Sequence, residues 1–265
     1  MFTYAGSLSG AAPIKRYFQI GETCYVGQLV MAPDAGVGGE VQILDVAAQD
    51  SEDDHRIIGI ITGVRNANDA GWSATAGYGD TATYDTTQAA MVANEPKDAV
   101  EVEVTYIIPG DTLVKGPFYN AAYGTAITEL VETSGSADGL TVTHANDTAI
   151  DSPDDYTTIY CRTGANRGQR RVVTTTATGS QTLTIPFTND IAVGDKFVTV
   201  NLVLGLAKLA IPASANYIEA SDTLTNFYDV FVHELNLEES GKEHAIFTVC
   251  SNASAFGGGI GFQGL

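Results

Sequence analysis

Apolar and polar residues alternate over many short runs of the chain, which is the pattern of strands that turn one face to a core. The cleanest run is residues 99–108, where the valines share one face and the glutamates share the other. Gly59 lies inside an apolar run and predicts a bulge or a close approach of a neighbouring backbone. Pro212 limits any helix in the ambiguous segment 206–218 to a short turn. Further strands are predicted at residues 24–31, 39–44, 56–64, 125–131, 139–143, 226–235 and 243–250.

Short strands separated by turns are expected throughout residues 159–204, which predicts a β-meander. The strands are placed at residues 171–176, 181–187 and 196–202, and the loops and turns at residues 164–168, 178–180 and 193–195. Two apolar faces are expected in this meander, one formed by Leu183, Ile185 and Phe187 and the other by Val198, Val200 and Leu202.

The fold class that these patterns predict is all-β, with two small barrel-like or sandwich-like lobes, extended terminal arms and little helix. The four predicted parts are an N-terminal arm at 1–16, an N-terminal β lobe at 17–109, a second β lobe at 110–250 and a Gly-rich C-terminal tail at 251–265. The boundary between the lobes is placed at Pro109, which ends the cleanest strand. A single continuous sandwich without this boundary is the alternative.

The charge of the chain restricts the classes of partner. There are 32 acidic residues and 13 lysines and arginines, for a formal net charge of −19. Phosphate contacts require lysine and arginine, so we expect no nucleic-acid partner. The same excess of negative charge keeps a protein away from anionic membranes, and no stretch approaches the roughly 20 apolar residues of a membrane span. Adaptation to salty surroundings is an alternative explanation for the acidic balance.

The cysteines and the first residues of the chain bear on the compartment. Cys24, Cys161 and Cys250 are widely spaced and form no C-x-x-C pair, so neither a disulfide framework nor a zinc site is expected. Buried or partly buried thiols in a protein made in a reducing cytoplasm are expected instead. The first 18 residues lack a basic segment followed by a long apolar run, so we expect no signal peptide.

The chain lacks the short motifs of common catalytic sites. It contains no G-x-S-x-G turn and no phosphate-binding glycine loop. The acidic loops 50–54 and 151–155 offer carboxylates for calcium, but they lack the spacing of an EF-hand, so solvated turns are expected. The four histidines lie on unrelated segments, at His55, His144, His233 and His244. We therefore expect no enzyme activity, no cofactor and no metal site.

An arginine cluster is the sharpest positive signal in the sequence. Four of the seven arginines lie within ten residues, at Arg162, Arg167, Arg170 and Arg171. An arginine fork binds carboxylates in two places at once and tolerates burial at an interface. Docking to acidic groups of a partner is one hypothesis for this cluster. Ion pairs with the many acids of the same chain are the alternative.

Three further pairs of residues are candidates for a partner interface. Basic residues of the N-terminal arm could lie in an acidic groove, aromatic residues of the aperiodic segment 66–95 could form a contact patch, and phenylalanines of the tail could insert into a neighbour. These pairs are Lys15 and Arg16, Trp72 and Tyr78, and Phe256 and Phe262. The alternatives are disorder of the two terminal segments and packing of the aromatic residues on their own core.

The segment Cys-Arg-Thr-Gly-Ala-Asn-Arg-Gly-Gln-Arg-Arg-Val-Val at 161–173, with the Thr-rich strand that follows it and Ile-Ala-Val-Gly-Asp-Lys-Phe at 191–197, resembles virion proteins of tailed bacteriophages. It is most similar to head decoration, or cement, proteins. The earlier segments 27–30, 56–61 and 112–116 resemble the N-terminal half of such proteins.

This resemblance implies a non-enzymatic protein on the outer surface of a phage capsid, synthesised in the host cytoplasm, that binds the major capsid protein and stabilises neighbouring capsomers. It also implies self-association as a homotrimer or homodimer. Two alternatives stay open. One is another phage structural role, such as a tail tube or head fibre, and the other is a carbohydrate-binding β-module that uses Trp72 and nearby tyrosines.

Overall fold

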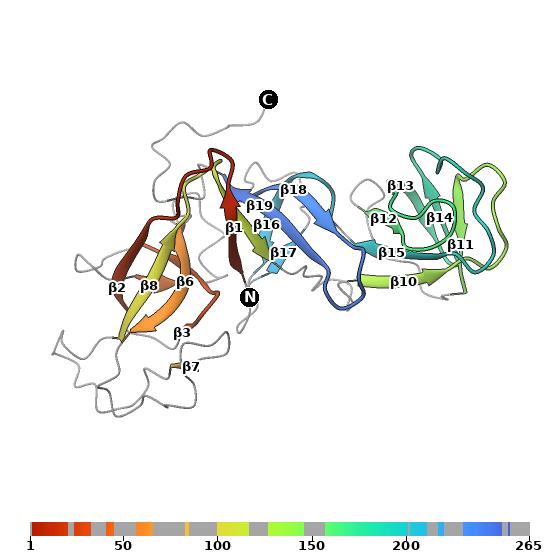
Figure 1. Cartoon of the computed structure of the whole chain (residues 1–265). Helices are drawn as coiled ribbons and strands as arrows, with labels where there is room; N and C mark the ends of the chain where they lie inside the picture. Colours follow the sequence, from red (N-terminus) through yellow and green to blue (C-terminus); the bar gives the residue numbers. More distant parts are fainter. Residues whose placement is uncertain are drawn as a thin grey trace.

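The fold consists of antiparallel β-sheets (Figure 1). The computed structural model describes residues 2–20, 24–32, 41–44, 57–65, 83–84, 100–116, 127–145, 157–200, 202–210, 217–219, 230–250 and 254. Within these residues every element of regular secondary structure is a β-strand, and every pair of neighbouring strands is antiparallel. The predicted all-β fold class is confirmed.

Three sheets make up most of the structure. The N-terminal sheet has the order β2 (Lys15–Ile20), β8 (Val100–Tyr106), β6 (Ile57–Arg65), β4 (Leu29–Met31) and β5 (Gln42–Ile43). The central sheet has the order β1 (Thr3–Ser7), β9 (Thr112–Gly116), β19 (His244–Val249), β18 (Val230–Asn236), β16 (Gly205–Ala210) and β17 (Tyr217–Glu219). A short pair is formed by β3 (Cys24–Tyr25) and β7 (Thr83–Tyr84).

The third sheet, which we call the inserted barrel, lies between β9 and β16 in the sequence. Its order is β10 (Ile127–Val131), β15 (Lys196–Val200), β12 (Thr158–Cys161), β13 (Arg170–Ala177), β14 (Ser180–Leu183) and β11 (Thr141–Thr143). An antiparallel bridge between Glu132 and His144, just beyond β10 and β11, brings the two outer strands together. At the start of the barrel, Ile127 pairs with Val200, so its first and last strands begin and end side by side.

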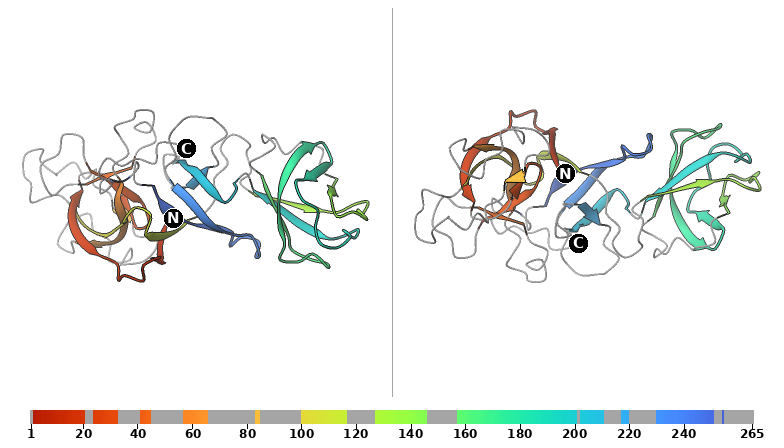
Figure 2. Two further views of the ribbon diagram at one scale, coloured as in Figure 1. Left: turned by 90° about the horizontal axis from the view of Figure 1, so that it is seen from above. Right: turned by 90° about the horizontal axis from the view of Figure 1, so that it is seen from below.

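The three sheets follow one another along the molecule. Figure 1 shows the N-terminal sheet on one side, the central sheet in the middle and the inserted barrel on the other side, and the views from above and below in Figure 2 keep this order. The hairpin formed by β18 and β19 runs from the central sheet toward the barrel.

The grouping of strands into sheets differs from the division inferred from the sequence. Residues 110–250, expected as one lobe, contain the inserted barrel and most of the central sheet. Strand β1, within the expected N-terminal arm, pairs with β9, and Phe2 is fully buried with its ring centroid 5.4 Å from that of Phe247. These pairings join segments far apart in the chain, which local sequence patterns do not encode.

The central core receives residues from all three sheets. Leu29 and Ile60 come from the N-terminal sheet, Val114 and Phe247 from the central sheet, and Val198 from the barrel strand β15. Each of these side chains is fully buried. Full burial of such a side chain contributes about 1.5–3 kcal/mol, so this core fastens the three sheets to one another.

Strand β15 serves two cores because its two faces are both covered. Phe197 lies in the core of the barrel, whereas Val198, Val200 and Leu202 lie in the central core. The predicted shared face of these last three residues is confirmed. A strand with apolar residues on both faces is typical of a strand buried between two layers.

The predicted alternation in residues 181–187 is wrong at one position. Strand β14 ends at Leu183, and the side chain of Ile185 is 62% exposed. Pro186 follows and has no N–H with which to continue a ladder. The chain then turns back, and buried Phe187 donates its N–H to the carbonyl oxygen of Gly139 at 2.9 Å.

Two other local predictions are confirmed. In β8, Val102 and Val104 are fully buried while Glu103 points outward. A Cβ atom on Gly59 would overlap the carbonyl oxygen of Thr105 on β8, which is the close backbone approach expected there. The predicted strands at residues 226–235 and 243–250 correspond to β18 and β19, which pair as a hairpin whose turn is closed by the N–H of Lys242 donating to the carbonyl oxygen of Glu239 at 3.2 Å.

Candidate functional site

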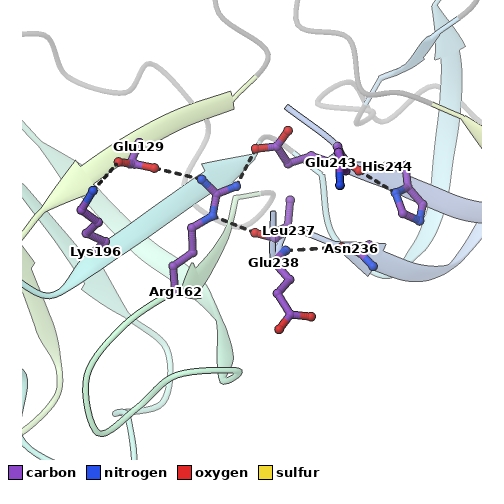
Figure 3. Close-up of polar contacts among 9 residues, drawn as sticks. Glu129, Arg162, Lys196, Asn236, Leu237, Glu238, Glu243 and His244 are labelled. Carbon is purple, nitrogen blue, oxygen red and sulfur yellow. Dashed lines mark hydrogen bonds and ion pairs between the residues drawn. The ribbon is translucent and has the colours of Figure 1, made fainter. Parts of the chain in front are cut away.

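Arg162 links the inserted barrel to the β18–β19 hairpin (Figure 3). It directly follows β12, and its guanidinium donates to Glu129 Oε2 on β10 at 3.0 Å through Nη1. On the hairpin side, Nε donates to the carbonyl oxygen of Leu237 at 2.9 Å and Nη2 to Glu243 Oε1 at 2.5 Å. We call these four residues the arginine clamp.

The pair of Arg162 and Glu243 within the arginine clamp is largely buried, whereas the side chain of Glu129 is 40% exposed. The side chain of Arg162 is 8% exposed and that of Glu243 is 7% exposed. A buried charge is tolerated only when it is paired and its hydrogen-bonding groups are satisfied. Three of the guanidinium nitrogens have acceptors here, and two carboxylates share the positive charge. The clamp therefore fixes the hairpin against the barrel in one geometry.

Two weaker ion pairs flank the clamp. Lys196 Nζ lies 3.4 Å from Glu129 Oε1, and Arg167 Nη2 lies 3.3 Å from Glu238 Oε1 on the hairpin turn. The side chains of Arg167 and Glu238 are 66% and 57% exposed. An exposed pair of this type contributes about 0–1 kcal/mol, so Arg162 carries the connection.

The loop that carries these arginines is shaped by the buried amide of Asn166. Its Nδ2 donates to the carbonyl oxygens of Asn189 and Asp190, and its Oδ1 accepts from the backbone N–H of Asn189 at 2.9 Å. Thr163 Oγ1 accepts from the backbone N–H of Lys196 at 2.7 Å. The segments 161–173 and 191–197, which carry the resemblance, thus bind each other within the barrel.

Gly164 is required by this loop for two reasons. Its φ of +75° lies in the left-handed region, and a Cβ atom there would overlap Asp195 Oδ1. Asp195 is itself buried and accepts from the backbone N–H of Ala192 at 3.0 Å. The glycine lets the loop lie directly on the turn before β15.

Arg171 is also used within the barrel. It donates to Pro186 O at 2.9 Å, Arg170 O at 2.7 Å and Gln169 Oε1 at 2.8 Å, and its guanidinium carbon lies 5.2 Å from the centroid of the Phe187 ring. Arg170 is different, because its exposed guanidinium makes no ion pair or hydrogen bond with any part of the chain that the structure describes.

Arg170 lines a polar cavity of about 320 Å³ between the barrel and the hairpin. Tyr160 and Gly168 join it on the barrel side, and residues 233–238 form the opposite wall. Burial raises the pKa of the Tyr160 phenol, and the carboxylate of Glu238 acts in the same direction. The cavity holds charges of both signs, so its lining does not select one class of charged ligand.

The predicted interface residues of the N-terminal segment lie on the N-terminal sheet, away from the clamp. Lys15 Nζ donates to Glu103 Oε1 at 2.7 Å, and Arg16 donates to the carbonyl oxygen of Lys15. Hydrogen bonds from Lys15, and after it from Thr62 and Tyr17, hold the pKa of the Glu103 carboxyl below its ordinary value. The other four predicted residues lie outside the described ones: Trp72, Tyr78, Phe256 and Phe262.

The remaining expectations concern metals and thiols. Within the ranges that the structure describes, no group of three or more His, Cys, Asp or Glu side chains is placed to hold a metal. The acidic loops 50–54 and 151–155 lie outside those ranges. Cys161 is buried, and burial raises the pKa of its thiol to about 11; Cys250 is half-buried, as the expectation of buried or partly buried thiols requires.

Sequence patterns identified Arg162 but not its partners. Glu129, Leu237 and Glu243 carry no local signal, and Glu243 lies 81 residues from Arg162 along the chain. A second group that sequence reasoning missed is buried inside the barrel, formed by Glu132, His144 and Gln181. Its only sequence signal is a polar residue on the inward face of a predicted strand.

Comparison with known proteins identifies no relative: no family model matches the chain, and neither does any curated protein or solved structure. Within the described ranges there is no helix long and apolar enough to cross a membrane.

Proposed function

We propose that the protein is a structural component of a tailed-bacteriophage virion that binds the outer surface of the capsid and cements neighbouring capsomers. Its partners in this role are the major capsid protein and further copies of itself, as a trimer or dimer. It acts without a cofactor, and it is synthesised in the host cytoplasm before it joins the particle.

The observation that carries this proposal is the way the inserted barrel is fastened to the rest of the chain. A brace between two capsomers must hold two contact surfaces at a fixed separation. The central core draws residues from all three sheets, and the arginine clamp adds a buried ion pair between the barrel and the hairpin. A body fastened in this way passes force from one end to the other without bending at a linker.

The resemblance of residues 161–173 and 191–197 to head decoration proteins supports the same role. In this chain both segments build the loop and strands of the barrel rather than an open cleft with converging catalytic groups. Arg162 and Arg171 are used inside the chain, and Arg170 is the arginine of this group that is left exposed and unpaired among the described residues. We assign Arg170 to the capsid-facing surface.

The energetic basis of cementing is burial repeated over the shell. A specific protein–protein contact buries about 1,200–2,000 Å² in total. Each copy that contacts two capsomers gains the second contact at high effective concentration, so modest contacts add to a large stabilisation of the particle.

Electron cryomicroscopy of the particle that carries the protein tests the proposal. Density for the three-sheet body on the outer surface of the head supports it. Density in the tail or in a fibre replaces it with one of the other phage structural roles. A protein that is absent from every particle contradicts it, and a rise in melting temperature with sugars would then support the carbohydrate-binding alternative.

Binding to heads that lack the protein tests the assignment of Arg170. In a co-sedimentation assay the Arg170→Glu variant is expected to bind less tightly than wild type, because it reverses an exposed charge. Lys242→Glu is the matched control, since Lys242 is also exposed but lies at the hairpin turn, in a pair with Glu239. Equal binding by the Arg170→Glu variant and wild type contradicts the assignment.

A further inference from the structure

A buried polar cluster lies where the inserted barrel closes on itself. Glu132 follows β10 and His144 follows β11, and the two residues form the bridge that joins these outer strands. Gln181 lies in β14, which pairs with β11. The three residues are 1%, 4% and 0% exposed, respectively. We call them the seam cluster, and the contact between β10 and β11 the seam.

Glu132 holds the seam through backbone donors. Its Oε1 accepts from the N–H of Ser134 at 3.1 Å and of Gly135 at 2.9 Å, and its Oε2 accepts from the N–H of Thr143 at 2.8 Å. The N–H of Thr133 donates across the seam to the carbonyl oxygen of Thr143 at 2.9 Å. The closure of the barrel therefore depends on a few hydrogen bonds around one carboxylate.

His144 and Gln181 are incompletely satisfied at this place. Nε2 of His144 lies 3.5 Å from Nε2 of Gln181, while Nδ1 of His144 and Oε1 of Gln181 are buried without a hydrogen-bond partner among the residues that the structure describes. A neutral imidazole needs one donor partner and one acceptor partner, but a protonated imidazole donates from both nitrogens. Rotation of the Gln181 amide would supply one acceptor, and the second N–H of the imidazolium would still have none.

The charges around His144 do not offset the free-energy cost of burying an imidazolium with an unsatisfied N–H. Among the described residues, Glu132 on the β10 side is the charged group that acts on the ring. On the β14 side the Gln181 amide beside the ring and the carbonyl oxygen of Gly179, which accepts from the backbone N–H of His144, are neutral. The Glu132 carboxylate is already bound by backbone donors from Ser134, Gly135 and Thr143. Burial lowers the pKa of His144, and the opposing effect of Glu132 is the smaller one.

We propose that the seam cluster is an acid-sensitive lock, in which proton uptake by His144 opens the seam between β10 and β11. In the closed barrel an imidazolium is buried, and one of its N–H groups has no acceptor among the described residues. Opening of the seam exposes this N–H to water, which accepts its hydrogen bond. This inference concerns the barrel alone and does not rest on the proposed role in a virion.

The direction of the pH effect follows from the two pKa values. In the closed barrel the pKa of His144 is below its ordinary value of 6.5, whereas in the open seam it returns to that value. The open state therefore binds the proton more tightly, and the closed state loses stability as the pH falls below about 6.5. The loss is complete once the pH is below the pKa of His144 in the closed barrel.

Hydrogen exchange of the intact protein, measured by mass spectrometry, tests the proposal. The measurements are made at about pH 7.5 and about pH 5.5, on either side of the ordinary histidine pKa. After correction for intrinsic exchange rates, protection of the Thr133 and Thr143 amides, which donate across the seam, is expected to fall in acid by up to about tenfold per pH unit. Amides of β6 and β8 in the N-terminal sheet, two strands without a histidine, serve as the internal reference and are expected to keep their protection.

Two variants separate His144 from other acid effects. His144→Gln keeps a polar side chain that takes up no proton, so its seam is expected to lose the acid response. His233→Gln is the matched control, because burial also lowers the pKa of His233 but this residue lies on β18, outside the barrel. The response is expected to remain in that variant.

A titration of wild-type His144 by NMR keeps the test decisive if the His144→Gln variant does not fold. A ring that titrates below the ordinary histidine pKa agrees with the proposal. A ring that titrates at or above 6.5 overturns it, because Glu132 would then stabilise the imidazolium inside the closed barrel. Seam protection that changes no more with pH than that of β6 and β8 also overturns it.

Discussion

Replacing Arg162 with methionine is the sharpest test of the connection between the barrel and the hairpin. The substitution keeps an unbranched side chain but removes the charge, so Glu243 loses its cation while its side chain remains 7% exposed. Removal of one partner from a buried ion pair costs about 3–5 kcal/mol, because the other charge is left without compensation. We expect the free energy of unfolding of Arg162→Met to fall by about this amount.

The control for this experiment is the neighbouring pair on the same hairpin. Arg167→Met breaks the pair with Glu238, in which both side chains are more than half exposed, and is expected to cost about 0–1 kcal/mol. Adding Glu243→Gln to Arg162→Met removes the stranded carboxylate and is expected to restore part of the loss. Such recovery distinguishes an electrostatic cost from a loss of packing.

Urea unfolding followed by circular dichroism measures these differences, and hydrogen exchange of the hairpin turn reports whether the contact opens locally. A loss for Arg162→Met no larger than that for Arg167→Met would refute the reasoning. It would mean that the guanidinium and Glu243 are reached by water and contribute no more than a surface pair.

Three further outcomes are expected. Gly164→Ala places a side chain at a positive φ and against Asp195, so its melting temperature is expected to fall further than that of Gly168→Ala. At Gly168 the φ is +88°, but no heavy atom lies within 4 Å of the added Cβ. Equal losses of melting temperature would show that Asp195 does not constrain the loop. Cys161, with its pKa raised to about 11, is expected to react with iodoacetamide at neutral pH more slowly than Cys250 in the native protein and equally fast in denaturant; equal native rates would contradict its burial. Lys15→Met is expected to raise the pKa of Glu103 toward its ordinary value of 4.5, as read by NMR titration. The lowered pKa of Glu103 stabilises the fold above pH 4.5, and this stabilisation is lost as the pH falls from that value through the lowered pKa. The variant is therefore expected to be less stable at neutral pH and to lose less stability on acidification; an unchanged pKa would contradict this.

Local patterns in the sequence were sufficient for most of the strands. The alternation in residues 99–108 places Val102 and Val104 in the core and Glu103 outside, as the structure shows for β8. The exception at Ile185 arises next to Pro186, where the missing N–H ends the ladder that the alternation assumed. Alternation predicts which face a residue takes only while the strand continues.

The arrangement of the strands and the partners of Arg162 were not predictable from local patterns. Strand β1 pairs with β9 across more than a hundred residues, and the hairpin contacts the barrel through side chains distant in sequence. An arginine in a loop reads the same whether its acceptor is in a partner or in its own chain. Only the fold places Glu129 and Glu243 on either side of Arg162.

The pairing of Ile127 with Val200 has a consequence for how such a protein can change in evolution. Because the first and last strands of the barrel are neighbours, a sequence of this type can enter a loop of another sheet without separating the strands on either side. Its removal is a different matter, since Val198 and Val200 of β15 fill the central core as well. The barrel is a module that can be gained in one step. Once its last strand has become part of the host core, it cannot be lost unless other side chains replace Val198 and Val200 in that core.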